Sequence, residues 1–524
     1  MGLFEKYYDK VALQRTNFET MLAVIEKTDD MQEKLEIAEF ALHYAVYNNT
    51  GYFTSSILEK VFTDYAKSLQ VNLNGIRHKP NSFLHILTEG YGAGGHTRVV
   101  ERWIENAPFS QSHSVVILKH NGAVLETLTK NIANKNGEFI IFDTSLNLKD
   151  RALKLRELAM GYEYVILHTH MEDATAVVAF GVKDFTRPVL FYNHASHLFW
   201  IGKSITDLLL DLWHDDDITR KRRKIFNTYF LGIPSKKIQL IDADKTASRK
   251  KLNLPLNKKI IVTAGSDFKF KPIDDENLLD LIEQIIDDEY ICYAIGIPQN
   301  DKAWSKGQGK NGGKIIPLGV INFDDGYMDY IKSADLYLDS YPVGGETAMI
   351  DAISIGTTAL SLKSVYPQAD YLAATRAYCL TKNDFIQKAK KILSNENFAR
   401  EILDEERQSL IKYQSIEAWN EKIENLLKIA PKNHKMQDLS EEKDFCEIDD
   451  ICVLNNVTYN KNFMTKCEVI SEKDIKDGFV YKKIGVDWLI SLEKRRKVKG
   501  TKTKIIKLFN IPIMQWSKKF NKQL

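Results

Sequence analysis

The spacing of hydrophobic positions changes along the chain, and each change marks a boundary between predicted regions. Over residues 1–79 apolar residues recur three or four positions apart, as Phe18 and Met21 do, and a second such set spans residues 35–45. This spacing gives each of several helices one apolar face. We therefore predict an all-α N-terminal region that packs against the next domain; a helical interaction scaffold is the alternative.

Short runs of apolar, mostly β-branched residues replace the helical spacing from residue 80 onwards. Five such runs occur, at 83–88, 114–118, 139–142, 164–168 and 188–192. Apolar strands that alternate with helix-length segments are typical of a parallel sheet covered on both faces. We predict an α/β, Rossmann-like domain over residues 80–240.

The alternation begins again after a polar, lysine-rich linker near residues 234–255. Five further runs, at 259–263, 291–295, 314–317, 336–339 and 358–362, predict a second Rossmann-like domain over residues 255–430. Two such domains in series would face a central cleft lined by the carboxyl ends of their strands. Residues 431–524 are predicted to form an appended polar region that ends in a basic tail.

Composition and charge restrict the class of protein. The chain has 524 residues, of which 44% are hydrophobic and 27% charged, as in soluble multidomain proteins. Its net charge of +2 gives no global field that would indicate nucleic acid as a partner. No secretory signal, no long apolar run and no Cys-x-x-Cys pair occur. We expect a cytoplasmic protein that binds no metal.

The basic tail is the strongest local concentration of charge. Residues 494–524 contain 11 Lys or Arg and no acidic residue, and apolar stretches at 505–509 and 511–514 interrupt them. This combination suits an anionic membrane surface, where each cation contributes about 1 kcal/mol. Pro512 prevents a long amphipathic helix, so a solvated strand or disordered tail is the alternative. Peripheral attachment to the inner face of the membrane is the resulting expectation.

A glycine-rich loop follows the first strand of the first predicted domain. Gly92, Gly94 and Gly95 are followed directly by His96 and then Arg98. Backbone N–H groups at a helix start can face an oxyanion, and His96 lies where a cleft would place it. The glycines fit a dinucleotide fingerprint, but the acidic residue expected about 20 positions later is missing. A packing turn is the alternative.

A second polar connection follows the last strand of the same domain. It contains Asn193, His194, His197 and Trp200. The two histidines could bind zinc, but no third ligand has a suitable spacing. A neutral imidazole can instead act as a general base or donate to a sugar or phosphate, so His194 is a candidate base. Satisfaction of buried backbone groups by one histidine is the alternative.

The strongest phosphate-binding pattern lies in the second predicted domain, between the strand 336–339 and a predicted helix. Glycines let the backbone approach a ligand closely, and the N–H groups of a helix start favour a phosphate. A turn needed only for packing is the alternative. The candidate residues of this turn and helix are Gly344, Gly345, Glu346, Thr347 and Asp351.

Two lysines follow the first strand of this domain. Lys269 and Lys271 could neutralise a diphosphate leaving group, on which charge builds as a glycosidic bond breaks. Two surface lysines are the alternative. The acidic runs 215–217 and 242–244 resemble an Asp-x-Asp metal signature, but we interpret them as solvated.

Together these segments resemble glycosyltransferases of the GT-B type. The spacing from Tyr341 to Gly356 is similar to that of cytoplasmic adhesin-modifying N-glycosyltransferases, grouped with the O-GlcNAc transferases in family 41. There an aromatic-Pro-x-Gly turn precedes an Asp, which corresponds to Asp351 here. The resemblance covers about residues 80–430. It implies a helical domain ahead of two catalytic domains, and one of the two lysines against the diphosphate.

This sequence also departs from that family. Glu346 replaces a polar uncharged residue and resembles the acidic residue of retaining family 4 enzymes, but their second Glu is Ser354 here. Retention or inversion therefore stays open. The loop 92–96 is similar to a glycine-rich loop of the lipid II N-acetylglucosaminyltransferase, in which the final histidine is a candidate base.

The resemblance implies a nucleotide-sugar donor, expected to be UDP-linked, with its base and ribose near residues 319–324. The acceptor would be a cell-surface glycan, which the basic tail favours, or a protein, which the family 41 likeness favours. Neither a cofactor nor a metal is expected. A nucleotide-sugar 2-epimerase of the same architecture and a non-catalytic scaffold are the alternatives.

Overall fold

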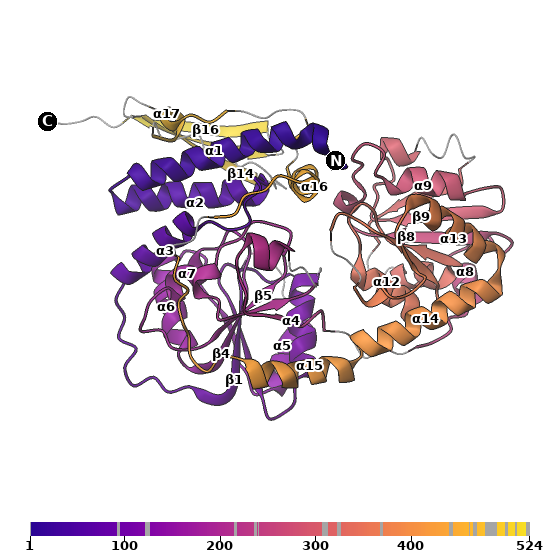
Figure 1. The fold of residues 1–524 in the computed structure, drawn as a ribbon, viewed down its shortest axis with the longest axis horizontal. Coiled ribbons are helices and arrows are strands. Elements are labelled where there is room, and N and C mark those ends of the chain that lie inside the picture. The colour runs from indigo at the N-terminus through magenta and orange to yellow at the C-terminus, as the bar shows by residue number, and fades with distance from the viewer. Residues whose placement is uncertain are drawn as a thin grey trace. The chain divides into compact units, whose positions relative to one another are not determined.

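The chain forms two compact units in a computed structural model (Figure 1). The first unit comprises Met1–Phe230 and Ile429–Leu524, and the second comprises Leu231–Lys428. The structure describes residues 2–91, 95–120, 126–213, 217–234, 238, 240–305, 313–321, 326–366, 370–439, 444–460, 462–464, 469–476, 490–497, 501–508 and 511–519.

The first unit begins with helices and continues as an alternating α/β domain. Its elements are η1 (Glu5–Tyr7), α1 (Tyr8–Lys27), α2 (Met31–Tyr47), α3 (Ser56–Ser68), β1 (Lys79–Leu87), α4 (Gly95–Asn106), β2 (Ser112–Ile117), α5 (Glu126–Asn134), β3 (Phe139–Ile141), α6 (Leu148–Ala159), β4 (Tyr162–His168), α7 (Thr175–Phe180), β5 (Val189–Asn193), η2 (Lys203–Ile205), β6 (Leu208–Asp211), η3 (Asp217–Arg222) and β7 (Thr228–Phe230).

All seven strands are parallel and lie in the order β3-β2-β1-β4-β5-β6-β7. Helices α4 and α5 pack on one face and α6 and α7 on the other, so both faces are buried (Figure 1). This double burial explains why the strands are continuously apolar. Strands β6 and β7 were not predicted from the sequence.

Helices α1 to α3 share one hydrophobic core with the first sheet. Phe18 of α1 and Phe62 of α3 belong to the same buried cluster as Val165 of β4. The buried carboxylate of Glu59 in α3 also accepts hydrogen bonds from the backbone N–H groups of Gly202 and Lys203, at 2.5 and 2.8 Å. The predicted all-α N-terminal region is therefore confirmed, and it is an integral part of the first unit.

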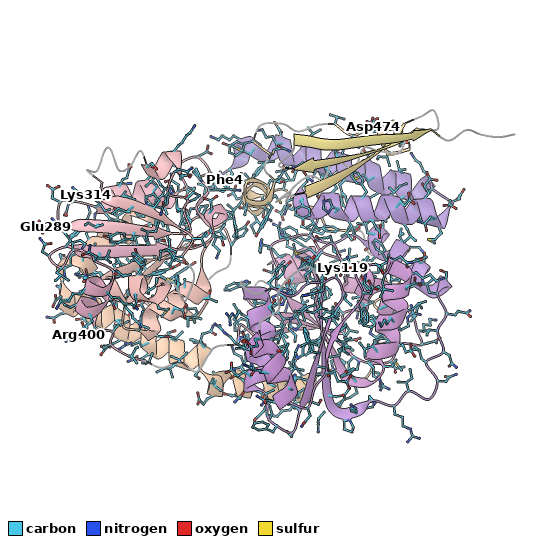
Figure 2. All side chains as sticks on the ribbon, turned by 180° about the vertical axis from the view of Figure 1, so that it is seen from behind. Phe4, Lys119, Glu289, Lys314, Arg400 and Asp474 are labelled. Atoms are coloured by element: carbon cyan, nitrogen blue, oxygen red, sulfur yellow. The ribbon has the colours of Figure 1, made fainter. Side chains whose placement is uncertain are left out.

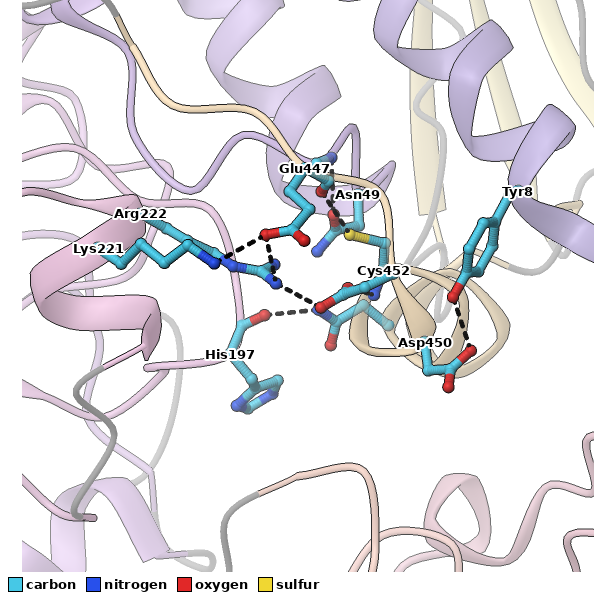
Figure 3. Close-up of polar contacts among 11 residues, drawn as sticks. Tyr8, Asn49, His197, Lys221, Arg222, Glu447, Asp450 and Cys452 are labelled. Carbon is cyan, nitrogen blue, oxygen red and sulfur yellow. Dashed lines mark hydrogen bonds and ion pairs between the residues drawn. The ribbon is translucent and has the colours of Figure 1, made fainter. Parts of the chain in front are cut away.

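The chain returns to the first unit through α16 (Asp450–Tyr459) and α17 (Glu472–Lys476). Asp450 accepts from the N–H groups of Leu3 and Phe4, both at 2.7 Å, and from Tyr8 Oη at 3.0 Å (Figure 3). Asn456 pairs with the backbone of Asn49 in both directions, at 3.0 and 2.9 Å. Residues more than 400 positions apart thus complete one core.

The second unit repeats the α/β alternation. Its elements are α8 (Lys245–Lys251), β8 (Lys259–Ala264), η4 (Asp267–Phe270), α9 (Leu278–Ile285), β9 (Tyr290–Ile295), β10 (Ile315–Gly319), α11 (Tyr327–Ser333), β11 (Leu336–Leu338), α12 (Glu346–Ser354), β12 (Ala359–Leu362), η6 (Asp370–Leu372), β13 (Tyr378–Cys379), α13 (Lys382–Ser394), α14 (Glu396–Gln414) and α15 (Ile416–Ile429).

The six strands of this unit are also parallel, in the order β10-β9-β8-β11-β12-β13. Adjacent residues of β8 enter different cores: Ile261 packs with α9 and α13, whereas Ile260 and Val262 pack with α11 and α12. Figure 2 shows the side chains of this unit, with Glu289 and Lys314 labelled. The predicted pair of Rossmann-like domains is confirmed.

The described part of the basic tail is a three-stranded antiparallel sheet. Its strands are β14 (Ile490–Lys497), β15 (Thr501–Leu508) and β16 (Ile511–Lys519), with β15 in the centre. Pro512 lies near the start of β16, and the register shifts between Ile506 and Lys507 opposite it. Across the described residues, no helix is both long and apolar enough to span a membrane.

Candidate functional site

Both sheets have the same point of topological reversal. In the first, β2 and β3 lie on one side of β1, and β4 to β7 lie on the other; in the second, β8 occupies the position of β1 and β11 that of β4. The connections that leave two such adjacent strands run to opposite faces, which leaves a crevice at the carboxyl edge. We therefore expect the functional residues to lie at the carboxyl ends of β1 and β4, and of β8 and β11.

In the first unit, the two predicted histidines come together at this edge. His96, near the start of α4, donates from Nε2 to the carbonyl oxygen of His168 at 2.8 Å. His194, directly after β5, is hydrogen-bonded through Nε2 to Nδ1 of His168 at 2.8 Å. The ring centroids of His96 and His194 are 4.3 Å apart. His168, the last residue of β4, therefore organises both candidate bases.

His168 belongs to a longer row of buried histidines that the sequence analysis did not single out. Its Nε2 is 3.1 Å from Nδ1 of His85 in β1, and Nε2 of His85 is 3.0 Å from Nδ1 of His113 in β2. The row ends at Gln111, whose Oε1 is 3.1 Å from Nε2 of His113. The only sequence signal was three histidines in apolar strands, which ordinarily indicates isolated core residues.

Burial keeps these imidazoles neutral. It lowers the pKa of His85 to about 3, and burial together with His170 lowers that of His96 to about 4. Burial, followed by the neighbouring histidines, also holds the pKa values of His113, His168 and His194 well below the ordinary value. Neutral rings can accept a proton, as a general base must.

Charged groups lie beside this edge rather than within the row. Thr88, directly after β1, donates to Asp173 at 2.8 Å, and Lys119, labelled in Figure 2, is 3.4 Å from the same carboxylate. Burial raises the pKa of Asp173, but Lys119 and the hydroxyls of Thr175 and Thr88 outweigh it and hold that pKa far below its usual range. Lys119 and Asp173 also line a polar cavity of about 200 Å³.

The other predicted acceptor-side residues are dispersed. Gly94 lies outside the described residues, and Gly95 begins α4. Arg98 forms an ion pair with Glu101 in the same helix, at 3.0 Å. The remaining three face the interior of the first unit: Asn193 donates to Asp211 at 2.8 Å, His197 bonds Tyr459 of α16 at 3.0 Å, and Trp200 is 1% exposed and stacked on Phe191.

In the second unit, Lys269 bridges the two strands at the point of reversal. It follows β8, and its Nζ donates to the carbonyl oxygen of Gly344, in the turn after β11, at 2.7 Å. Asp339 directly follows β11 and accepts from the N–H groups of Ser340 and Gly345, at 2.8 and 2.7 Å. Burial raises the pKa of Asp339, although Gly345 and Lys269 act in the opposite direction.

This geometry changes which backbone groups can meet a ligand. The Gly345 N–H is directed at the internal carboxylate of Asp339, so it is not one of the outward donors of the turn. Helix α12 begins at Glu346 without a side-chain cap, and within the described residues no partner is found for the N–H groups of Thr347 and Ala348. The backbone N–H groups that could bind a phosphate are therefore those in the first turn of α12.

The remaining donor-side residues have the following positions. Lys271 directly follows η4, and Thr347 is exposed. Asp351 lies near Tyr327, whose pKa is raised by burial and by that carboxylate. The side chain of Glu346 and residues 322–325 lie outside the described part of the chain, and Gly319 ends β10.

Two glycines let the carboxyl ends of β8 and β9 approach each other. Gly296 has a φ of +94°, and a Cβ placed on it would lie 1.8 Å from the carbonyl oxygen of Gly265. Both facts require glycine at this position. The stem of Lys269 lies across Gly265, 3.4 Å from the position of its missing Cβ. The sequence analysis did not predict these contacts, because the two glycines are 31 positions apart.

Solved structures share the fold of this chain. The chain is similar to HepE of Anabaena in complex with UDP and glucose (12% identity, 66% of this chain and 99% of that chain, TM-score 0.51) and with UDP-glucose (12% identity, the same coverage, TM-score 0.50). It is also similar to a mutant O-GlcNAc transferase of Thermobaculum terrenum (12% identity, 81% and 83% coverage, TM-score 0.49). No family model and no curated protein matches the sequence.

The class that the fold defines is therefore the GT-B fold, as the sequence predicted. An identity of 12% establishes a fold and not a reaction, and it does not assign the chain to family 41. Among the described residues, no group of three or more His, Cys, Asp or Glu could hold a metal ion.

The buried histidines predict that the first unit is more sensitive to mild acid than the second. Below about pH 6.5 the unfolded chain binds protons that the folded histidines refuse until about pH 4 or lower. The unfolded state therefore binds more protons in this window, and stability falls as the pH falls. The carboxyls of Glu39, Glu59 and Asp444, whose pKa values are raised by burial, act in the opposite direction, but they are three groups against five.

Amide hydrogen exchange, corrected for intrinsic rates, measures this difference. From about pH 7.5 to about pH 5.5, protection in β1 and β4 should fall, whereas protection in β8 and β11 should not. The second unit is an internal control, because all 12 histidines lie outside residues 231–428. Equal losses in both units would contradict the prediction.

Proposed function

We propose that the protein is a glycosyltransferase that takes a sugar from a nucleoside-diphosphate donor. In this proposal the second unit holds the donor diphosphate, and the histidines of the first unit deprotonate the acceptor. One observation carries it: each sheet has groups suited to one half of this reaction at its own point of topological reversal. Lys269 and the start of α12 supply cationic and N–H donors, and His96 and His194 supply neutral bases.

The proposed binding of the donor depends on positive charge beside its diphosphate. As the bond from the sugar C1 to the diphosphate breaks, negative charge develops on the diphosphate oxygens. An ammonium has three N–H donors, so Lys269 can bind such an oxygen while it donates to Gly344. The uncapped N-terminus of α12 adds backbone donors and the positive end of the helix dipole. HepE binds UDP and UDP-glucose, so a UDP-linked donor is the first choice.

The proposed reaction at the acceptor requires an uncharged imidazole. An imidazole that is neutral at pH 7 can remove a proton from a hydroxyl or amide as that group attacks C1. In an inverting displacement, this proton transfer accompanies attack from the face opposite the diphosphate. We propose that no metal takes part, since lysine and helix N–H groups can hold the charge of the leaving group.

We further propose that the acceptor is a glycan assembled at a membrane and that the basic tail holds the protein there. Strands β14 and β15 contain Lys494, Arg495, Arg496 and Lys497, and Lys502, Lys504 and Lys507. Cations at this density near anionic headgroups contribute about 1 kcal/mol each and are screened by salt.

Incubation with a panel of nucleotide sugars, without acceptor, tests the reaction class. A transferase should release nucleoside diphosphate slowly by hydrolysis, and release should continue in the presence of EDTA. Interconversion of the sugar without release would instead identify an epimerase. If neither product forms and calorimetry detects no nucleotide binding, the protein is a non-catalytic scaffold and the proposal fails.

Replacing Lys269 with Ala should weaken UDP binding about tenfold to a hundredfold, because a hydrogen bond to a charged group contributes about 1.5–3 kcal/mol. Lys271→Ala tests the second predicted lysine in the same way. Isothermal calorimetry measures both, and Lys390→Ala, on an exposed residue of α13, is the matched control. Unchanged affinity in the Lys269→Ala, Lys271→Ala double variant would exclude this diphosphate site.

Changing Lys502, Lys504 and Lys507 to Gln should reduce sedimentation with vesicles that contain phosphatidylglycerol. Wild-type protein should sediment with these vesicles, lose binding at high salt, and ignore vesicles of phosphatidylcholine alone. Deletion of residues 494–524 should abolish binding. Equal binding by wild type and deletion would remove the tail from the proposal without affecting the donor site.

A further inference from the structure

Four histidines and one glutamine form a continuous hydrogen-bonded chain through the first sheet. It starts at His194, at the carboxyl edge, and ends at Gln111, directly before β2. Successive N···N distances are 2.8, 3.1 and 3.0 Å, and the last N···O distance is 3.1 Å. Each link joins Nε2 of one residue to Nδ1 of a neighbour, so the order of atoms repeats. The members are His194, His168, His85, His113 and Gln111.

The glutamine at the end determines where every proton lies. An amide oxygen only accepts hydrogen bonds, so His113 must carry its proton on Nε2 to donate to Gln111. A neutral imidazole has one N–H, so Nδ1 of His113 is an acceptor, and His85 must donate to it from Nε2. The same reasoning passes to His168 and then to His194. It leaves Nδ1 of His194 without a proton.

We propose that Gln111 fixes the tautomers of this chain, so that Nδ1 of His194 is unprotonated and can act as the base that deprotonates the acceptor. His168, His85 and His113 are then positioning residues that act through His194. The assignment of the tautomers stands on the hydrogen bonds alone, whereas the role of His194 as a base rests on the proposed function. Among the described residues, no hydrogen bond to Nδ1 of His194 is found.

The chain also gives the captured proton somewhere to go. A proton taken up at Nδ1 of His194 makes an imidazolium, which can pass its Nε2 proton to Nδ1 of His168. His168 can pass its own Nε2 proton to His85, and His85 can do the same to His113. His194, His168 and His85 each gain one proton and give one, whereas His113 only gains one. A single positive charge therefore moves from His194 to His113, and no proton leaves the chain.

His96 lacks such a connection, which distinguishes the two candidate bases. Its Nε2 donates to a backbone carbonyl, which cannot take a proton onward, and its Nδ1 is buried without a partner among the described residues. Its ring lies 4.3 Å from that of His194. Of the two candidate bases, only His194 therefore has a hydrogen-bonded route by which a captured proton can move onward.

The titratable groups around the chain are few. His194 faces His96 and His170, and both disfavour its protonation. His168 faces His96 in addition to its two chain partners, and Lys135 faces His113 and disfavours a charge there. His170 itself contacts Tyr91, whose hydroxyl also bonds Glu89 at 3.1 Å. No carboxylate appears among the causes of these four pKa shifts.

Nitrogen NMR of protein labelled with ¹⁵N-histidine tests the tautomers directly. Protonated and unprotonated ring nitrogens have separate shifts, and a coupling across each N–H···N bond identifies the linked pair. All four histidines should carry the proton on Nε2. In His85→Phe, which interrupts the chain and retains a ring, His194 should show a mixture of tautomers. A proton on Nδ1 of His194 in the wild type, or the same tautomer in both proteins, would overturn the proposal.

The Gln111→Glu variant changes the end of the hydrogen-bonded chain that is farthest from His194. It tests whether the chain affects activity. A carboxylate there keeps the same tautomers and favours a proton on the chain. The apparent pKa of the acidic limb of kcat/KM should therefore rise by about one unit or more. Ser110→Glu adds the same charge at an exposed neighbouring position and is the matched control. A shift no larger than that of the control would refute the relay.

The two measurements separate this proposal from the proposed function. If the NMR tautomers are as expected but no sugar is transferred to any acceptor, the tautomer chain stands and the base role of His194 falls. If transfer occurs with mixed or reversed tautomers, the transferase stands and the chain falls. The NMR experiment needs no substrate, so it decides the tautomers even when activity is absent.

Discussion

The structure depends on one topological constraint, which acts once in each unit. Parallel strands are joined by right-handed crossovers, so a chain that adds strands first on one side of β1 and then on the other must reverse its winding. At that reversal the connections after two adjacent strands leave to opposite faces. The polar residues that follow β1 and β4, or β8 and β11, are therefore brought together at this edge.

The groups at this edge are charged in one unit and neutral in the other. In the second, a lysine ammonium, a helix N-terminus and a buried carboxylate are arranged around a glycine turn, which suits an anionic ligand. In the first, burial removes charge from the imidazoles and leaves a neutral hydrogen-bonded chain. Under the proposed function, positive charge in the second unit would stabilise the leaving group, and a neutral imidazole in the first would act as the base.

The first unit also shows why an appended segment can be structural. Asp444 accepts from the N–H of Ser56 at the start of α3, and Asp450 accepts from the backbone near residue 3. These carboxylates satisfy N–H groups that otherwise have no partner at helix starts. The N-terminal helices, the first sheet and residues 444–460 consequently form one folded unit, although the chain between them makes another.

The sequence by itself determined the elements and the fold class. The apolar runs predicted the principal strands, and the glycines of the turn before α12 and the lysines after β8 identified one edge of one sheet, because these signals are local. It missed β6 and β7, and also β13, which has only two residues. The tertiary structure decided the rest: that His194 and His96 meet at His168, that Asp339 takes the Gly345 N–H, and that His85 and His113 extend the row. Hydrogen-bond partners in a parallel sheet lie on different strands, and their pairing depends on register and side-chain direction, which residue spacing does not encode.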